Sequence, residues 1–246
     1  MEFINLKGIV VRTVNTGESD KYIDVFTDKL GKVTIYVKGA RSNKTRNLVG
    51  SQLLNYCDYV LYQKKDKYYI SSCELIESFY GVRNDIILLT YASHFLDIAN
   101  SVICENECQI TLLKLLLNTL YILSKGNRDP KLINIIFELR LLKILGYEPY
   151  TKGCVDCGQN TDRMFFDFLA DGLVCDECRR IGKSSIKLKK PSIEALKFIM
   201  NVSQKDIFKF TLDMVYIEEL DKMSKTYLKE KLDKNYNKLD FLDTLN

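Results

Sequence analysis

Four cysteines stand in two close pairs, Cys154 with Cys157 and Cys175 with Cys178, and seventeen residues separate the pairs. A Cys-x-x-Cys turn places two thiolates at one edge of a knuckle, and two such knuckles can enclose a zinc ion in a tetrahedron of sulfur. Four protein ligands leave no position for water or substrate, so the spacing predicts one structural Zn²⁺ per chain. Disulfides or a redox pair are the alternatives, but nothing in the sequence suggests export.

The segment that joins the two pairs has the pattern of a β-hairpin. Residues 163–169 read as a strand, residues 170–172 as a turn, and residues 173–174 lead back to the second pair. A hairpin of this size cannot bury a core of its own. We therefore expect the metal to hold the segment together as a zinc finger.

Length and composition favour a globular protein of a reducing cytoplasm. The chain has 246 residues, enough for two or three domains with cores of their own. Residues 1–5 lack the pattern of a signal peptide, and Lys114 interrupts the most apolar stretch, residues 110–123. Neither export nor membrane insertion is therefore expected. The cysteines outside the pairs are interpreted as buried free thiols. They are Cys57, Cys73, Cys104 and Cys108.

Basic residues gather in two runs that contain no acidic residue, although the net charge is only +4. The first run lies between Asp28 and Asp58, and the second between Glu177 and Glu194. The first holds Lys29, Lys32, Lys38, Arg41, Lys44 and Arg46, and the second Arg179, Arg180, Lys183, Lys187, Lys189 and Lys190. Either run alone could be a solvated face of the protein. Two runs of similar strength, one of them beside the cysteine pairs, favour a polyanionic partner.

The first eighty residues have the pattern of a small all-β barrel. Apolar residues alternate with polar ones, which predicts strands, and turn residues separate these runs. The runs cover residues 7–14, 22–27, 32–38, 56–63 and 68–72. Five strands in this length are typical of the OB-fold, whose sheet face and loops bind single strands of nucleic acid.

The third predicted strand carries the clearest candidate surface. Its alternate apolar residues, expected in the core, are Val33, Ile35 and Val37. Lys32, Tyr36 and Lys38 then face outward and place an aromatic ring among ammonium groups, as a stacking platform for bases and phosphates requires. The alternative is a solvated outer face that happens to carry one tyrosine.

From Val82 onward the apolar residues recur with the period of a helix. Such stripes cover residues 86–99, 110–123, 132–145, 193–200 and 212–232. We therefore predict a multi-domain α and β protein, with an N-terminal OB-fold β-barrel followed by an α-helical domain that contains an inserted four-cysteine zinc finger. The predicted parts are residues 1–80 for the barrel, 81–150 and 181–246 for the helical domain, and 151–180 for the zinc finger.

The sequence offers no candidate catalytic group, so the protein is not expected to be an enzyme. His94 is the single histidine and lies in an apolar stretch, where a core or boundary position is expected. Residues 182–184 resemble the end of a phosphate-binding loop, but Glu177 stands where that motif requires a glycine. A zinc hydrolase is disfavoured because four cysteine ligands leave no open position on the metal.

Two motifs lie in order along the chain, the first in the predicted barrel and the second leading into the first cysteine pair. The first motif comprises Gly8-Ile-Val-Val-Arg12, Gly17-Glu18-x-Asp20, Thr27-x-x-x-Gly31-Lys32 and Lys38-Gly39-Ala40-Arg41. The second is Phe137-Glu-Leu-Arg140-Leu-Leu-Lys-Ile-Leu-Gly146-Tyr147-x-Pro149, which runs into Cys154-x-x-Cys157-Gly158. Together, in this order and spacing, the two motifs resemble the RecO family of bacterial DNA repair and recombination mediators. The resemblance covers nearly the whole chain. It implies an OB domain, a helical domain with an inserted zinc finger, and no catalytic activity.

The resemblance also implies a function and partners. A RecO-like protein binds single- and double-stranded DNA, anneals complementary strands, works with RecR, and contacts single-strand binding protein while RecA is loaded. It acts in the bacterial cytoplasm, at the nucleoid when active. The residues expected to contact phosphates are Arg12, Lys32, Lys38, Arg41, Lys44 and Arg46, with Arg179, Arg180 and Lys183 as a second patch and Tyr36 as the stacking residue. The alternative is a zinc-ribbon protein-interaction adaptor in transcription or translation.

Overall fold

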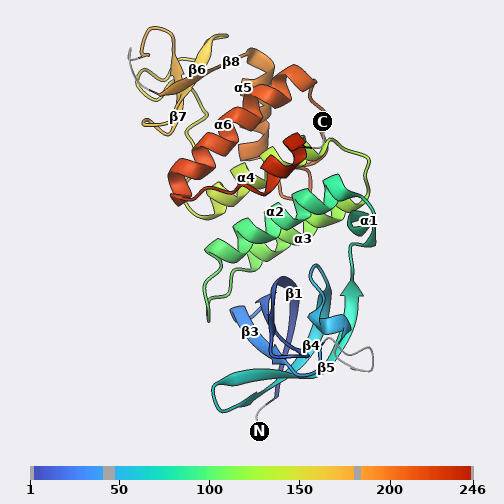
Figure 1. Cartoon of the computed structure of the whole chain (residues 1–246). Helices are drawn as coiled ribbons and strands as arrows, with labels where there is room; N and C mark the ends of the chain where they lie inside the picture. The colour runs from blue at the N-terminus through green and yellow to red at the C-terminus, as the bar shows by residue number, and fades with distance from the viewer. Residues whose placement is uncertain (1–2, 41–47, 180–183, 245–246) are drawn as a thin grey trace. The chain divides into compact units, whose positions relative to one another are not determined.

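The structure is a computed structural model that describes residues 3–40, 48–179 and 184–244 (Figure 1). Internal contacts divide the chain into two compact units. Unit 1 comprises Met1–Lys125 and Asn237–Asn246, and unit 2 comprises Gly126–Tyr236. The predicted three-part division, with boundaries near residues 80, 150 and 180, stays a prediction. Over the described ranges, no helix is both long enough and apolar enough to cross a membrane.

Unit 1 begins with a closed barrel whose strands follow each other in the order β1-β2-β3-β5-β4, which confirms the predicted barrel (Figure 1). The strands are β1 (Phe3–Thr16), β2 (Asp20–Thr27), β3 (Gly31–Val37), β4 (Tyr56–Lys64) and β5 (Lys67–Glu77), and a short 3-10 helix, η1 (Val49–Ser51), precedes β4. Neighbouring strands are antiparallel except β3 and β5, which run parallel. The barrel closes where β5 returns beside β3.

The barrel core consists of the inward residues of the alternating pattern. Val33, Ile35 and Val37 are at most 4% exposed, as the alternation predicted. Tyr59 is fully buried, and its hydroxyl donates to the carbonyl oxygen of Gly50 at 2.9 Å. The one polar atom of this large side chain therefore has a hydrogen-bond partner inside the core. Alternation therefore fixes which face of each strand is available outside the barrel.

The loop between the helices that follow the barrel packs against the turn at Gly31. This residue has φ +62°, and a Cβ atom there would lie 2.2 Å from the carbonyl oxygen of Cys104, so only glycine fits. Lys32 donates its backbone N–H to the same oxygen at 3.0 Å. Cys104 and Cys108 lie in this loop with exposed side chains, so the expectation that they are buried was wrong. Cys57, on β4, is buried as expected.

The helices of unit 1 are α1 (Tyr80–Arg83), α2 (Ile86–Val102), α3 (Ile110–Ser124) and the C-terminal 3-10 helix η2 (Lys238–Thr244). Asp85 caps α2 by accepting the N–H groups of Ile87 at 2.7 Å and Leu88 at 3.1 Å. α2 packs against α3 and also against η2. His94, on α2, is 2% exposed, in agreement with an expected core position.

Unit 2 contains α4 (Pro130–Ile144), α5 (Lys190–Asn201), α6 (Met214–Leu232) and a small antiparallel sheet. The sheet has the order β7-β6-β8 and consists of β6 (Met164–Asp167), β7 (Gly172–Cys175) and β8 (Ser185–Leu188). The predicted hairpin corresponds to β6 and β7. The strand β8 was not predicted, because it is only four residues long and lies in a basic run. Phe166 packs edge-on against the fully buried Tyr227 at 5.1 Å, which joins this sheet to α6.

Candidate metal centre and nucleic-acid interface

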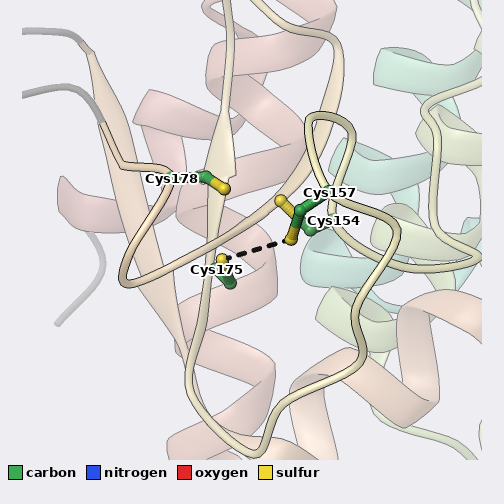
Figure 2. Close-up of side chains that lie close together, drawn as sticks. All are labelled: Cys154, Cys157, Cys175 and Cys178. Carbon is green, nitrogen blue, oxygen red and sulfur yellow. Dashed lines mark hydrogen bonds between the residues drawn. The ribbon is translucent and has the colours of Figure 1, made fainter.

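The four paired cysteines converge on one point, as the sequence spacing predicted. Figure 2 shows their side chains pointing toward one another from two turns, and all four sulfur atoms lie within 4.8 Å of one another. The Sγ atoms of Cys157 and Cys175 are 3.7 Å apart. A tetrahedron with metal–sulfur distances of about 2.3 Å has sulfur–sulfur edges of about 3.8 Å, so the cluster needs only a small contraction. These cysteines could hold a metal ion.

Each knuckle is closed by a backbone hydrogen bond of the same kind. In the first, Gly158 donates its N–H to the carbonyl oxygen of Cys154 at 2.8 Å; in the second, Arg179 donates to Cys175 at 3.0 Å. Gly158 has φ +75°, which a residue with a side chain rarely adopts. Two turns of one geometry therefore present two thiols each to a shared centre.

The charge state of the cluster favours a cation. Burial raises the pKa of Cys154, but hydrogen bonds from the backbone N–H groups of Cys175, Cys157 and Asp156 outweigh it and lower this pKa to about 6. Hydrogen bonding with the thiol of Cys175 raises the pKa of Cys178 instead. The thiolate of Cys154 therefore forms readily, and its negative charge disfavours ionisation of the neighbouring thiols. A divalent cation removes this repulsion, because each thiolate then faces positive charge.

The predicted phosphate contacts on β3 are further apart than the sequence suggested. Lys32 lies at the start of β3 beside the 104–107 loop and is partly buried, whereas Tyr36 is four residues further along, about 13 Å at the rise of a strand. Lys38 is exposed next to the far end of the strand. Tyr36 and Lys38 therefore share one end of the barrel, and Lys32 belongs to the other.

Arg12 is exposed on β1 and makes a 3.7 Å ion pair with Asp24, which also accepts the hydroxyl of Thr34 at 2.8 Å. An exposed pair of this length contributes little to stability, so the guanidinium can exchange its carboxylate for a phosphate at small cost. The predicted contacts Arg41, Lys44, Arg46, Arg180 and Lys183 lie outside the described residues.

Tyr36 is held in place by its hydroxyl. This group donates to the carboxylate of Asp20, whose other oxygen accepts the N–H of Gly39 at 2.7 Å. The hydrogen bond to Asp20 raises the pKa of Tyr36 to about 12, and the Gly39 N–H together with Tyr36 lowers the pKa of Asp20. The ring is fixed, and the Asp20 carboxylate accepts from three donors, since the hydroxyl of Ser19 also donates to it at 3.3 Å.

Tyr36 is one member of a row of aromatic residues that sequence reasoning missed. We call this row the aromatic belt; it comprises Phe3, Tyr62, Tyr69, Tyr36 and Tyr22, in that spatial order. Each belongs to a different strand, and successive ring centroids are 5.2–6.4 Å apart. Period-two alternation could have placed each ring outside the barrel. Only the strand order and register, however, bring them together.

The second basic run has fewer available charges than predicted, within the part of the chain that the structure describes. Arg179 stacks over the ring of Phe165 at 4.1 Å and is exposed. Lys189 and Lys190 are within ion-pair distance of Glu219 and Asp162, at 3.4 and 2.9 Å. Acidic side chains also border the knuckles and are exposed; they are Asp156, Asp176 and Glu177. The barrel is therefore the better supported of the two predicted DNA surfaces.

Comparison with known proteins identifies the family. The family model described as Recombination protein O N terminal matches residues 1–79, and the model described as Recombination protein O C terminal matches residues 83–240. The chain belongs to the RecO family. This confirms the resemblance seen in the two sequence motifs. The barrel is the OB-fold domain of the family, and the family consists of DNA repair proteins.

Full-length relatives agree with this assignment. A DNA repair protein RecO from Acetivibrio thermocellus is 44% identical over 246 residues, which are all of this chain and 98% of the relative. Proteins of the same name from Caldicellulosiruptor saccharolyticus and Alkaliphilus metalliredigens are 35% and 32% identical, over 98% and 96% of this chain and 98% and 97% of theirs. An adaptor of transcription or translation is not favoured by these similarities.

Proposed function

We propose that the protein binds single- and double-stranded DNA through backbone phosphates, anneals complementary strands and, with RecR, helps to load RecA on DNA covered by single-strand binding protein. The observation that carries the proposal is the full-length match to the RecO family of a chain whose OB barrel exposes cationic side chains. Among the described residues of the barrel, the proposed phosphate contacts include Arg12 and Lys38, whose side chains are exposed, and Lys32, which is partly buried. The protein needs no catalytic group for this work and is not an enzyme.

Annealing follows from charge neutralisation. Two complementary strands repel each other through their phosphates, and a basic surface that holds both reduces this repulsion and raises their local concentration. Neither effect requires a nucleophile, a general base or nucleotide hydrolysis. The expected site of action is the bacterial cytoplasm, at the nucleoid.

We further propose that the metal is one structural Zn²⁺, held by the thiolates of Cys154, Cys157, Cys175 and Cys178. Four cysteine ligands match the preference of zinc for soft donors in a tetrahedron, and the closed shell leaves no coordination position for a reactant. Its contribution would be to crosslink the two knuckles at the edge of β7. In this proposal the barrel, and not the metal centre, binds DNA.

The proposal is tested by the salt dependence of DNA affinity. Fluorescence anisotropy with labelled single-stranded and duplex DNA at two salt concentrations should show binding that weakens steeply as salt rises, since phosphate contacts release counterions. The double variant Arg12→Glu, Lys38→Glu should bind both DNA forms more weakly and flatten the salt slope by about two units, roughly one per lost contact. Lys222→Glu, an exposed lysine on α6, is the matched control. A folded double variant that binds like the wild type would place the contact surface elsewhere.

The partner interactions need a separate measurement. Annealing of complementary strands coated with single-strand binding protein should proceed in the presence of the wild-type protein, and RecA filament formation on such strands should require RecR as well. If naked strands anneal but coated ones do not, the protein binds DNA without acting as a mediator.

A further inference from the structure

The aromatic belt is continuous across every strand of the barrel. In the register of the strands, Phe3 lies opposite Tyr62, Tyr62 opposite Tyr69, and Tyr36 opposite Tyr22. The parallel pairing of β3 with β5 then brings Tyr36 to Tyr69, with ring centroids 5.7 Å apart. The rings of Tyr62 and Tyr69 are stacked, with an interplanar angle of 16° and centroids 5.3 Å apart. The belt is a single surface assembled from cross-strand neighbours.

The belt lies on the outside of the barrel. Residues next to its members in sequence point into the core, including Ile35 and Leu61, both 0% exposed, and Ile70, 7% exposed. By contrast, the four tyrosines are only partly buried, and Phe3 is 58% exposed. Aromatic pairs between two strands stabilise a sheet by themselves. A row that leaves aromatic surface partly in water across the whole barrel also provides area for a ligand.

A cation is fixed within the belt. The ammonium group of Lys67 lies 5.4 Å from the ring centroid of Tyr22 and 5.2 Å from that of Tyr36, and it donates to the hydroxyl of Tyr22 at 2.8 Å. That hydrogen bond raises the pKa of Lys67, so the group stays charged at neutral pH. The same β4–β5 hairpin exposes Lys64 and Lys65 against one acid, Asp66. The side of the belt nearest Lys67 therefore combines aromatic rings with net positive charge.

Partly exposed aromatic rings and a fixed cation together match the chemistry of an unpaired nucleotide. The faces of all bases stack on aromatic side chains, and the phosphate group forms an ion pair with the cation. In a duplex the base faces are already stacked on each other, so they cannot reach the belt. The carboxylate nearest to Tyr36, that of Asp20, accepts hydrogen bonds from Tyr36 and Gly39. These bonds lower its pKa, so it stays ionised, and the ammonium groups of Lys67, Lys64 and Lys65 supply the positive charge for a phosphate.

We propose that the aromatic belt stacks the bases of single-stranded DNA, with Lys67 contacting a phosphate. This inference rests on the proposed DNA binding and deepens it: phosphates give affinity for any DNA, and the belt adds affinity for unpaired bases only. The belt residues Tyr22, Tyr62 and Tyr69 thereby join Tyr36 as base contacts.

The test separates base contacts from phosphate contacts with three ligands: an oligo(dT), an abasic oligonucleotide of the same length, and a duplex of that length. The abasic strand keeps the phosphates and lacks the bases. The wild-type protein should bind oligo(dT) about tenfold more tightly than the abasic strand, as one stacked base predicts. Equal affinity for the two would overturn the stacking inference and leave phosphate-driven DNA binding intact. Binding to none of the three would remove both proposals.

Variants of Tyr69, the ring in contact with both Tyr62 and Tyr36, locate the effect. Tyr69→Ala should weaken oligo(dT) binding about tenfold and leave abasic and duplex binding unchanged. Tyr69→Phe keeps the ring and should behave like the wild type. Tyr121→Ala is the matched control, since Tyr121 is an exposed tyrosine on α3 that also has a lysine over its ring, Lys125 at 4.6 Å.

Unchanged duplex affinity also shows that the barrel of Tyr69→Ala is folded. If this variant loses affinity for all three ligands alike, or keeps its preference for oligo(dT), the belt is a structural feature of the barrel and not a base-binding surface.

Discussion

Arg140 fastens the end of α5 to α4 within unit 2. Its Nη1 donates to the carbonyl oxygens of Ile199 at 3.0 Å and Val202 at 3.1 Å, with a longer contact of 3.4 Å to Met200. These are carbonyls of the last turn of α5 and its C-cap, which have no partner within the helix and where the helix dipole favours a cation. Burial lowers the pKa of Arg140, but a guanidinium stays protonated at any pH at which proteins fold.

We expect Arg140→Met to lower the free energy of unfolding by about 3 kcal/mol. A charge-assisted hydrogen bond contributes about 1.5–3 kcal/mol, and a cation at a helix C-terminus about 0.3–1 kcal/mol more. The three contacts share one nitrogen, so their contributions do not add. Arg128→Met is the matched control, because Arg128 is also partly buried but makes one such bond, to the carbonyl oxygen of Phe210 at 2.8 Å. We expect about 1.5 kcal/mol for that variant, the lower end of the range for one charge-assisted hydrogen bond.

The measurement is urea unfolding followed by far-ultraviolet circular dichroism, in reducing buffer with zinc present throughout. The difference between the two variants, about 1.5 kcal/mol, corresponds to roughly a tenfold change in the unfolding equilibrium constant. The loss in Arg140→Met should be independent of pH near neutrality. If Arg140→Met is no less stable than Arg128→Met, the carbonyl contacts of Arg140 contribute nothing net to unit 2.

Three further outcomes are expected. Protein purified in reducing buffer without chelator should contain one zinc per chain by elemental analysis, and Cys154→Ser should lose the metal while the barrel keeps its stability; metal-free wild-type protein would contradict this. Burial raises the pKa of Asp221, against the opposing hydrogen bond from Lys225 and with a further rise from Glu138. The pKa of Asp221 is higher in the folded than in the unfolded state, so ionising this carboxyl group destabilises the folded protein. This destabilisation is absent below about pH 4, grows as pH rises toward the folded-state pKa, and persists at neutral pH. Asp221→Asn should therefore stabilise the protein at pH 7 and not at pH 4 in urea unfolding. Strand annealing should survive removal of ATP and magnesium and fall as salt rises, and an absolute requirement for ATP hydrolysis would show that a catalytic site exists.

Much of the structure could be predicted from the spacing of residues that are close in sequence. The Cys-x-x-Cys pairs need only two turns and a hairpin to converge, so their meeting at Cys154 and Cys175 could be read from a short stretch of sequence. Alternation within β3 likewise gave the buried face, because the side-chain period of a strand is fixed by the backbone. The barrel and the helices were predictable for the same reason.

Features that depend on strand order and register were not predictable. Tyr69 meets Tyr36 only because β5 returns beside β3, and no local pattern specifies that pairing. The distance of Lys32 from Tyr36 was also misjudged, since sharing a face of a strand does not make two residues neighbours. Cys104 has apolar neighbours in sequence, yet its side chain is exposed, because it lies in a loop that contacts the turn at Gly31 through its backbone carbonyl oxygen.

The packing of η2 on α2 makes unit 1 discontinuous in the chain. During synthesis, α2 leaves the ribosome long before η2 does, and all of unit 2 is made in between. Unit 1 therefore cannot finish folding until the chain has been translated past Lys238, and until then the surface of α2 that contacts η2 is uncovered. Unit 2 is continuous from Gly126 to Tyr236 and can complete its contacts earlier, so the part of the protein translated later can be the first to finish folding.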